Sequence, residues 1–425
     1  MLQATQFELR RLNARLKRRR SKATFIAVTG SSAKSTTTAL IAHILSGVEE
    51  THVQAVKNNL GDSIDTLSSG SPHRGYSVWE MNGGRPGCVR SMSQLLKPTI
   101  GLVTLVELEH KSAYGSRDAI QIEKQALIES LPDHGLALLN HDDVRVASMA
   151  AHTNARVKTF GKGGGDYLVS KVRAEEPGQL TLSVSHKQET CELKSRFTGA
   201  HQSLPVVAAY ACARELGVPI AICQERIASF KPIFGRCSVH VIENGPTFIA
   251  DTGKAPYHSI YLAIQMMAEF KAPRKRIVVG QISDTRGNPN PKYRDIYRAS
   301  RDAADQVIFI GEHSHRSKAT AVEIAEGRFL QIHNIEDLAR YLRETAVSGE
   351  IILLKSSSIL HLERTVLSFL SDVRCWKERC SIKYQCVECG LYGQSIERHS
   401  KNAQRISWEL DEVRDPVQRQ HIARG

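Results

Sequence analysis

Gly30-Ser31-Ser32-Ala33-Lys34-Ser35-Thr36-Thr37-Thr38 follows the apolar run Phe25-Ile26-Ala27-Val28, and a helical pattern follows it. A loop between a strand and a helix is a favourable place for phosphate, because backbone N–H groups and the helix dipole point at the bound oxygens. Lys34 can supply a positive charge to the β and γ phosphates, and Ser35 or Thr36 can supply a hydroxyl to magnesium. The segment therefore predicts a phosphate-binding loop.

The loop departs from the general pattern at two positions. Ala33 stands where a glycine normally precedes the lysine, and Val28 stands where an earlier glycine is expected. If Ala33 adopts a left-handed backbone, it costs roughly 1 to 2 kcal/mol more than glycine. The alternative interpretation is a cluster of helix-capping Ser and Thr residues with an exposed Lys34.

Apolar runs alternate with helical patterns along most of the chain, which predicts an α/β fold with a parallel sheet covered on both faces. In the first half, the expected strands are 25–28, 76–79, 100–106 and 136–139, and the expected helices are 36–45, 120–131, 204–216 and 220–230. The stretch 155–197 is richer in Gly, Ser and Thr and alternates in polarity, so it predicts a small antiparallel segment.

Pro and Gly in Lys231-Pro232-Ile233-Phe234-Gly235-Arg236 indicate a hinge between two periodic regions. Beyond it, runs at 239–242 and 247–250 begin a second alternating set. The set continues with runs at 276–280, 306–311, 329–332 and 350–354, each expected to precede a helix, as in a smaller Rossmann-like domain. The predicted organisation is a basic N-terminal helix (1–22), a central P-loop ATPase domain (23–235), a C-terminal Rossmann-like α/β domain (236–372) and a polar cysteine-containing tail (373–425).

The composition is that of a globular protein with several domains. The chain has 425 residues, of which 41% are hydrophobic and 24% charged. No stretch approaches the roughly 18 apolar residues of a membrane span, and the basic N-terminus lacks the apolar core of a secretory signal. The odd number of cysteines, nine, does not suggest a complete disulfide framework. These features favour the cytoplasm as the compartment.

The net charge of +13 favours polyanionic partners, and much of the excess lies in the first segment. Leu9, Leu12 and Leu16 recur there at helical spacing beneath a run of arginines and lysines. We expect a solvated helix that docks through this leucine stripe, ahead of an arm that binds an acidic partner, nucleic acid or a membrane surface. Aromatic residues that could stack on bases are not interleaved, which weakens the nucleic-acid alternative.

Four cysteines in the tail, Cys375, Cys380, Cys386 and Cys389, have the spacing C-x4-C-x5-C-x2-C. Four thiolates in a short span suit a tetrahedral Zn²⁺ site, since soft ligands select zinc or an iron–sulfur cluster. His399 can substitute for one cysteine. The alternative is a set of free thiols in a disordered tail.

Eight short segments occur in the same order as motifs of the Mur ligase family. The first resembles most closely the branch of the family that adds D-alanyl-D-alanine, and the match extends from about Thr24 to Leu370. The segments are Glu80–Gly87, Thr104–His110, Glu123-Lys124, Leu139–Asp143, Gly199–Gln202, Ser229–Arg236, Asp251–Ser259 and Lys355–Ser357.

This resemblance implies an ATP-dependent ligase that activates a carboxylate as an acyl-phosphate, which an amine then attacks with release of ADP and phosphate. Such catalysis is mostly charge neutralisation and alignment. The family's first domain, which holds a UDP-sugar, has no counterpart in the sequence. We therefore expect a substrate other than a standard UDP-muramoyl peptide. The sequence does not indicate an oligomeric state.

The resemblance also implies roles for individual residues. The implied catalytic set is Lys34, Glu80, His110, Lys124 and Arg236. The implied nucleotide contacts are Gly30, Ser31, Ser32, Ala33, Lys34, Ser35, Thr36, Asn140, Gln202, Arg236, Asp251 and Lys254. The implied magnesium ligands are Ser35, Thr36, Glu80, His110 and a carbamate on Lys124.

Each of these residues has a plainer interpretation. Glu80 can be an exposed strand-end acid, His110 a hydrogen-bonded loop residue, Lys124 a solvated helix residue and Arg236 a hinge anchor. Departures from the family at Ala33, Gln202, Pro205 and the loop 253–258 favour a second hypothesis, in which a degenerate ligase serves as a nucleotide-binding scaffold for an acidic partner or nucleic acid. A P-loop ATPase or kinase is the third hypothesis.

Overall fold

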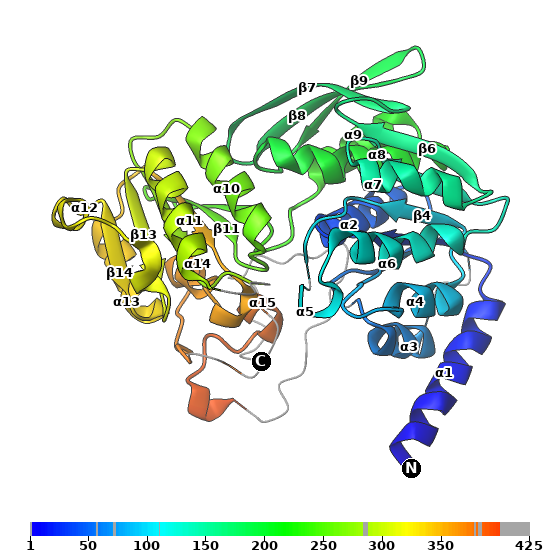
Figure 1. Ribbon diagram of the computed structural model, residues 1–425, viewed down its shortest axis with the longest axis horizontal. Helices are drawn as coiled ribbons and strands as arrows, with labels where there is room; N and C mark the ends of the chain where they lie inside the picture. The colour runs from blue at the N-terminus through cyan, green and yellow to red at the C-terminus, as the bar shows by residue number, and fades with distance from the viewer. Residues whose placement is uncertain are drawn as a thin grey trace. The chain divides into compact units, whose positions relative to one another are not determined.

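The computed structural model describes residues 2–56, 58–70, 74–109, 111–283, 288–377, 380 and 385–399. It divides into two compact units (Figure 1). The first unit comprises residues 1–173, 180–196 and 200–230, and the second comprises 174–179, 197–199 and 231–425. The main change of unit, at Lys231, falls at the start of the predicted hinge.

A nine-stranded sheet begins in the first unit, and its strand order is β2-β3-β1-β4-β5-β6-β7-β8-β9. Strands β2 to β6 run parallel around β1, whereas β8 and β9 form the predicted antiparallel segment. The strands are β1 (Thr24–Thr29), β2 (Thr51–Gln54), β3 (Tyr76–Glu80), β4 (Ile100–Val103), β5 (Leu136–Asn140), β6 (Arg156–Gly161), β7 (Tyr167–Glu176), β8 (Gln179–His186) and β9 (Glu189–Ser195). Because the parallel strands are covered on both faces, β1 is an almost continuous apolar run.

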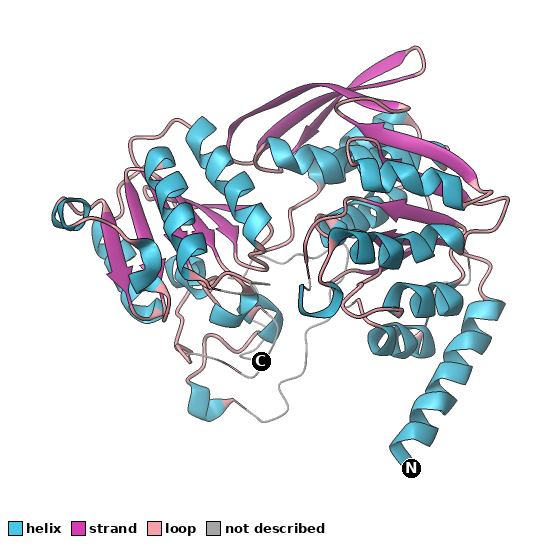
Figure 2. Cartoon of the chain, in the orientation of Figure 1, coloured by secondary structure: helices cyan, strands magenta, loops and turns pink. Residues whose placement is uncertain are grey.

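Helices cover the parallel strands on both faces (Figure 2). On one face Phe25 and Ala27 share a core with residues of α3, α4 and α6, while α2 packs with α8 and α9. The helices are α1 (Leu2–Arg20), α2 (Lys34–Leu45), α3 (Leu60–Ser69), α4 (Cys88–Leu96), α5 (Lys111–Tyr114), α6 (Arg117–Glu129), α7 (Val144–Ala147), α8 (Ser203–Glu215) and α9 (Ile220–Ser229). The sequence prediction of an α/β fold with a parallel central sheet is confirmed.

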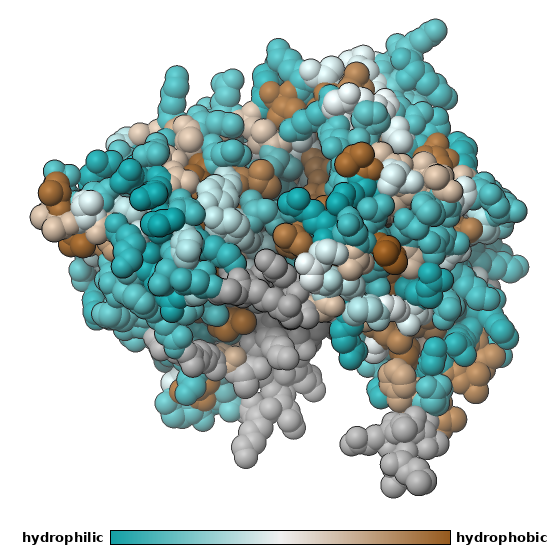
Figure 3. Space-filling view, in the orientation of Figure 1, coloured by the Kyte–Doolittle hydropathy of each residue, from teal (hydrophilic) through white to brown (hydrophobic). Residues whose placement is uncertain are grey.

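Helix α1 docks on the first unit, but not through its leucines. Leu9, Leu12 and Leu16 are 62%, 54% and 45% exposed, so the predicted docking stripe is wrong. The contact is made by buried Ala14 together with Lys17, which donates to the Ser68 carbonyl, and Arg18, which donates to the Lys97 carbonyl. These carbonyls lie at the C-terminal ends of α3 and α4. Cations are favoured there because the last carbonyls of a helix have no intrahelical hydrogen-bond donor and the helix dipole is negative at this end. Hydrophobic side chains along α1 reach the surface at the lower right of Figure 3.

The second unit contains a six-stranded sheet of order β10-β11-β15-β12-β13-β14, parallel except for the β10–β11 hairpin. A turn that contains left-handed Asn244 reverses the chain between β10 and β11. Its strands are β10 (Ser238–Val241), β11 (Thr247–Asp251), β12 (Lys275–Val279), β13 (Gln306–Ile310), β14 (Phe329–Ile332) and β15 (Ile351–Lys355). Its helices are α10 (Tyr257–Glu269), α11 (Asn290–Ala303), α12 (Ala321–Ala325), α13 (Ile335–Thr345), α14 (Arg364–Leu370) and α15 (Cys386–Cys389).

The described part of the tail is packed against this second sheet. Cys386, Val387 and Tyr392 belong to the same apolar cluster as Phe234 and Phe248. The tail is thus an integral part of the second unit as far as residue 399, although its sequence is polar. Within the described chain, no helix has the length and apolarity needed to cross a membrane.

Candidate nucleotide and metal site

The phosphate loop has the backbone that its sequence suggested. Gly30 has φ 144°, and a Cβ at this position would lie 1.9 Å from Thr104 Oγ1, so only glycine fits. Ala33 has φ 65° and is the residue before α2, so an alanine does occupy a left-handed position. The strain at Ala33 is located at the N-terminus of the helix, where phosphate is expected to bind.

The segment after β4 is hydrogen-bonded to the phosphate loop. The Ser31 N–H donates to the Leu105 carbonyl at 2.8 Å, and the Ser31 hydroxyl donates to the Glu107 carbonyl at 2.8 Å. The Thr104 hydroxyl donates to the Ser32 carbonyl at 2.7 Å. These contacts fix the loop before any ligand binds, which lowers the ordering cost of phosphate binding.

Lys34 is buried at the start of α2 and faces the loop. Its ammonium donates to the Gly30 carbonyl at 2.5 Å and lies 3.7 Å from Glu109 Oε2. Ser35 and Thr36 are also buried in the first turn of α2. The interpretation of Lys34 as an exposed side chain is therefore wrong, because the ammonium is directed back into the loop.

A second buried lysine shares the same carboxylate. Lys124 of α6 is 1% exposed, and its ammonium donates to Glu109 Oε1 at 2.6 Å. Burial lowers the pKa of Lys124, while the Glu109 charge opposes this shift. Lys124 is thus not a solvated helix residue. Glu109 was not assigned a role from sequence, although it lies in the quoted segment Thr104–His110.

Glu80 ends β3 beside the strand that carries the phosphate loop. In the parallel register Glu80 pairs with Val28, and its carboxylate is buried rather than exposed. Glu80 Oε2 accepts the Val56 N–H at 2.6 Å, and Oε1 accepts the Asn58 amide at 2.7 Å. These two donors fix the direction of the carboxylate at the end of the strand.

The loop after Glu80 reaches Lys124. Glu123 accepts the N–H groups of Gly87 and Val89 at 2.6 and 2.7 Å, which holds the start of α4 against α6. A Cβ on Gly83 would lie 3.7 Å from Lys124 Nζ. The structure therefore brings together the segments that carry Lys34, Glu80 and Lys124, whereas His110 lies outside the described residues.

Asn140 and Gln202, the residues expected near adenine, have other contacts in this structure. The Asn140 amide donates to the Thr104 carbonyl at 2.8 Å, and its oxygen accepts the Asp142 N–H at 3.1 Å. Asn140 thereby joins the ends of β5 and β4. Gln202 precedes α8 and lies 3.3 Å from the neighbouring His201 ring nitrogen. An adenine contact for either residue stays a prediction.

The second unit holds the remaining predicted residues. Asp251 Oδ2 accepts from buried Lys355 at 2.6 Å, and Lys355 also donates to the Lys254 carbonyl at 2.8 Å. The Arg236 guanidinium lies against Gly253, because a Cβ on Gly253 would be 3.1 Å from the guanidinium carbon. Lys355 is a further candidate residue, because it fixes the loop that contains Asp251 and Lys254.

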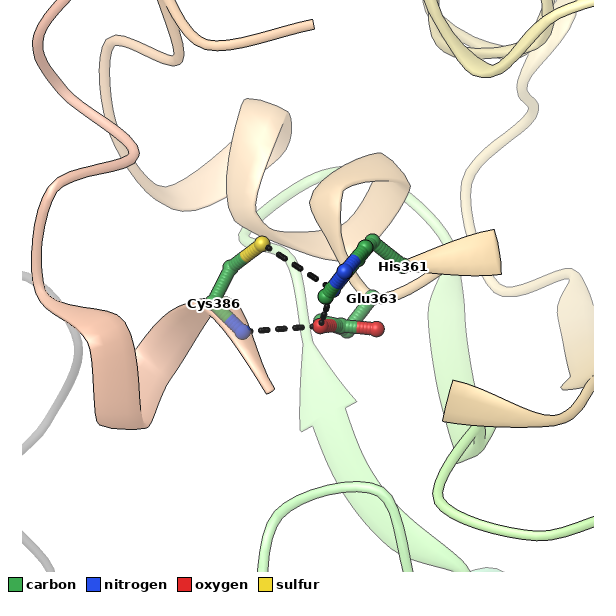
Figure 4. Close-up of side chains that lie close together, drawn as sticks. All are labelled: His361, Glu363 and Cys386. Carbon is green, nitrogen blue, oxygen red and sulfur yellow. Dashed lines mark hydrogen bonds and ion pairs between the residues drawn. The ribbon is translucent and has the colours of Figure 1, made fainter. Parts of the chain in front are cut away.

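Among the described residues, the four cysteines of the predicted zinc site do not form the compact ligand group. The compact group of potential ligands in the described chain is His361, Glu363 and Cys386, whose ligand atoms lie within 4.8 Å of one another (Figure 4). Cys386 Sγ accepts a hydrogen bond from the Arg364 guanidinium at 3.1 Å and lies 3.6 Å from His361 Nδ1. The charges of Cys375 and Cys380 both act on the Cys389 thiol, so these tail cysteines lie in one neighbourhood, and a zinc site of four thiols stays a prediction.

The fold and the phosphate loop define a two-domain α/β nucleotide-dependent ligase. Residues 28–213 match the Mur ligase middle domain, and residues 235–358 match the Mur ligase glutamate ligase domain. The chain belongs to the Mur ligase family, and it is an ATP-dependent enzyme that forms amide bonds. Family membership does not support the scaffold hypothesis.

Similar proteins include enzymes with different named substrates. The chain is 25% identical over 381 residues to a UDP-N-acetylmuramoyl-tripeptide–D-alanyl-D-alanine ligase of Mycobacterium tuberculosis, covering 84% of this chain and 74% of that protein. It is 23% identical to a UDP-N-acetylmuramate–L-alanine ligase of Clostridium acetobutylicum, covering 77% and 72%. A solved structure of MurF ligase from Thermotoga maritima in complex with ADP superposes with a TM-score of 0.75 at 21% identity, covering 85% and 83%.

Proposed function

We propose that the chain joins the carboxylate of a peptide or amino acid to an amine, using the buried Lys34–Glu109–Lys124 set beside the phosphate loop. A carboxylate oxygen attacks the γ-phosphorus of ATP, and ADP leaves. The amine then attacks the acyl carbon, phosphate leaves, and the amine loses a proton. The observation that carries this assignment is that Glu109 contacts both lysines, one from the phosphate loop and one from α6.

Lys34 is well placed to neutralise the transferring phosphoryl group. Its ammonium is within the loop and is held by a carbonyl and a carboxylate, both weaker partners than a triphosphate for a mobile cation. Backbone N–H groups at the start of α2 add further donors to the same oxygens. The left-handed Ala33 directs these groups toward the ligand.

The donor set fits magnesium. The Ser35 and Thr36 hydroxyls and the Glu80 carboxylate are hard oxygen ligands of the kind that Mg²⁺ prefers. Glu80 is fully buried and accepts two hydrogen bonds, but a carboxylate has about four lone-pair sites and retains capacity for a cation. When bound there, magnesium would neutralise negative charge on the phosphate oxygens.

A carbamate on Lys124 is consistent with its surroundings. Burial lowers the pKa of Lys124, which increases the share of neutral amine able to attack CO₂. The product is an anion within reach of the Glu109 carboxylate, so the pair changes from opposite to like charges. A second magnesium ion between them would offset that repulsion, and His110 is the further ligand expected from sequence.

The contacts of the second unit complete the proposal. Arg236 is assigned to the γ-phosphate, and Asp251 with Lys254 to the nucleotide. The Lys355 ammonium holds both members of that loop, so we assign it a positioning role. Asn140 and Gln202 stay assigned to the adenine. An acidic partner for α1 has no specific contact in its favour and is not part of the proposal.

The proposal names a peptide or amino-acid carboxylate and an amine as substrates, and no narrower class. The similar enzymes named above differ in both the acid and the amine that they join. The fold they share is therefore compatible with several substrates, because specificity lies in individual side chains.

A hydroxylamine trap tests the proposal. The full chain is incubated with ATP, magnesium, hydroxylamine and a panel of amino acids, peptides and muramoyl peptides, and hydroxamate is measured. We expect hydroxamate and acid-dependent release of ADP from at least one acid, and loss of both in Lys34→Met. Release of ADP without any hydroxamate across the panel would favour the ATPase hypothesis and contradict the acyl-phosphate.

A further inference from the structure

The second unit contains a buried cluster of three chemically different side chains. His361 and Glu363 lie between β15 and α14, and Cys386 begins α15 in the tail. Their exposed fractions are 2%, 0% and 6%. Figure 4 shows the imidazole, the carboxylate and the sulfur converging. In the sequence, Cys386 lies 23 positions after Glu363 and 25 positions after His361.

The distances in the cluster match those between ligands of one zinc ion. Cys386 Sγ lies 3.6 Å from His361 Nδ1, and His361 Nδ1 lies 3.3 Å from Glu363 Oε1. With Zn–S near 2.3 Å and Zn–N and Zn–O near 2.0 to 2.2 Å, tetrahedral geometry separates sulfur from nitrogen by about 3.6 Å and nitrogen from oxygen by about 3.4 Å. Both separations agree with the structure.

Hydrogen bonding within the protein does not satisfy the cluster. Glu363 Oε2 and His361 Nε2 are buried without a hydrogen-bond partner, although each is almost inaccessible to solvent. Burying such groups unpaired costs roughly 1 to 3 kcal/mol each. Glu363 Oε2 is the second oxygen of the carboxylate whose Oε1 lies 3.3 Å from His361 Nδ1, so this carboxylate has acceptor capacity that the protein does not use.

Neighbouring groups support the sulfur and the carboxylate. The Arg364 guanidinium donates to Cys386 Sγ at 3.1 Å, and the Cys386 N–H donates to Glu363 Oε1 at 2.8 Å. Contacts of this kind orient metal ligands from the outer shell.

We propose that His361, Glu363 and Cys386 bind a divalent cation of zinc type and that this ion fastens the tail to the second unit. A mixed sulfur, nitrogen and oxygen set favours zinc over magnesium, which prefers oxygen ligands alone. The ligand set combines one tail thiol with two side chains of the domain, unlike a site of four tail cysteines.

Fastening the tail fixes one of its residues beside the hinge. Gln385 precedes Cys386, and its side-chain amide nitrogen is so close to Gly235 that a Cβ on Gly235 would lie 2.0 Å from it. The same nitrogen would be 3.1 Å from a Cβ on Gly253, the residue that Arg236 also contacts. The ion therefore holds Gln385 between the hinge and the loop that follows β11.

Metal content and cobalt spectra of the full chain test this site. After dialysis against metal-free buffer and loading with Zn²⁺ or Co²⁺, we expect one tightly bound ion per chain. The Co²⁺ form should show a sulfur-to-cobalt charge-transfer band and the visible bands of a tetrahedral ion. Cys386→Ser should lose the charge-transfer band, and His361→Asn should weaken zinc binding by at least 10-fold. Cys191→Ser, which changes a buried thiol in the first unit, should retain both.

Two outcomes would overturn the proposal. One is a wild-type chain that retains no zinc after dialysis and shows no charge-transfer band with cobalt. The other is loss of zinc in Cys375→Ser and Cys380→Ser but full retention in His361→Asn and Glu363→Gln, which would assign the ion to the tail thiols. The wild-type measurements do not depend on how well any variant folds.

Discussion

The Lys124 ammonium and the Glu109 carboxylate form a 2.6 Å ion pair in which the side chains are 1% and 4% exposed. Isolated charges are not stable in such an interior, so each group depends on the other. Lys34 lies 3.7 Å from the same carboxylate, and one acid thus faces two cations. This arrangement is costly for stability alone and suits a site where charges are exchanged with a ligand.

Removing either partner of this pair should destabilise the first unit. We expect Glu109→Gln to lower the free energy of unfolding by about 3 to 5 kcal/mol, because the Lys124 ammonium is then buried without its partner. Lys124→Met should cost less, because Lys34 still lies 3.7 Å from the Glu109 carboxylate. The double variant should lose less than the sum of the two. Denaturant unfolding measures all three.

The exposed pair Arg173–Glu192 provides the control. Its side chains are 48% and 42% exposed, so Arg173→Met should cost less than about 1 kcal/mol. Strictly additive losses at Glu109 and Lys124 would show that the two residues are energetically independent, contrary to the structure.

Activity should require CO₂ and should fall as the pH is lowered. Burial depresses the pKa of Lys124 in the folded chain, so the amine gives up its proton at lower pH than in the unfolded chain. The unfolded state binds more protons between the two pKa values, and this group's contribution to stability therefore rises with pH. Carbamate formation needs the neutral amine, so it should also increase as the pH rises.

The carbamate is detected directly by NMR of the chain equilibrated with ¹³C-bicarbonate. We expect one protected carbamate signal, loss of activity on CO₂ depletion and recovery on adding bicarbonate. Lys124→Arg keeps the charge but is not expected to form the carbamate, so it should be inactive under both conditions. Full activity without CO₂, together with no carbamate signal, would remove Lys124 from the metal site.

Glycine at position 33 should stabilise the chain. Ala33 has φ 65°, which costs roughly 1 to 2 kcal/mol relative to glycine, while glycine adds about 0.4 to 1 kcal/mol of chain entropy to the unfolded state. Ala33→Gly is therefore expected to raise the free energy of unfolding by about 0.5 to 1 kcal/mol. Ala39→Gly, within the same helix, should lower it by about 1 kcal/mol. If both variants lowered the free energy of unfolding, or both raised it, the result would contradict backbone strain at Ala33.

Patterns local in sequence were predictable, and contacts between distant segments were not. The strand before Gly30 and the helix after it follow from apolar periodicity, and the Lys34 loop follows from local chemistry. The partnership of Glu109 with Lys124 links a loop to a helix 15 residues later and depends on tertiary packing. Arg18 illustrates the same limit, since its partners are carbonyls at a helix end that leave no mark in side-chain periodicity.

The cluster of His361, Glu363 and Cys386 shows a further limit of sequence spacing. Cys386 was assigned to a set of neighbouring cysteines because four thiols in a short span resemble a zinc motif. The structure pairs it with His361 and Glu363, which lie before α14. Single His and Glu residues carry no periodic signal, so only the fold brings them to the thiol.

Asn58 should control the magnesium dependence without touching the reacting groups. Its amide donates to Glu80 Oε1 at 2.7 Å and orients the carboxylate that we assign to magnesium. Loss of such an outer-shell partner typically weakens metal affinity by about 10- to 100-fold. We therefore expect Asn58→Ala to raise the magnesium concentration for half-maximal hydroxamate formation by that factor, while the maximal rate at saturating magnesium changes much less.

The adjacent Asn59 separates this effect from a loss of local structure. Asn59 caps α3 by accepting the Asp62 N–H at 3.0 Å and makes no hydrogen bond to Glu80 within the described chain. Asn59→Ala should cost about 1 kcal/mol of stability, as removal of a helix cap does, and should leave the magnesium dependence unchanged. If both variants shifted the magnesium dependence equally, the cause would be disorder of the 56–62 segment, and Asn58 would have no specific role in orienting Glu80.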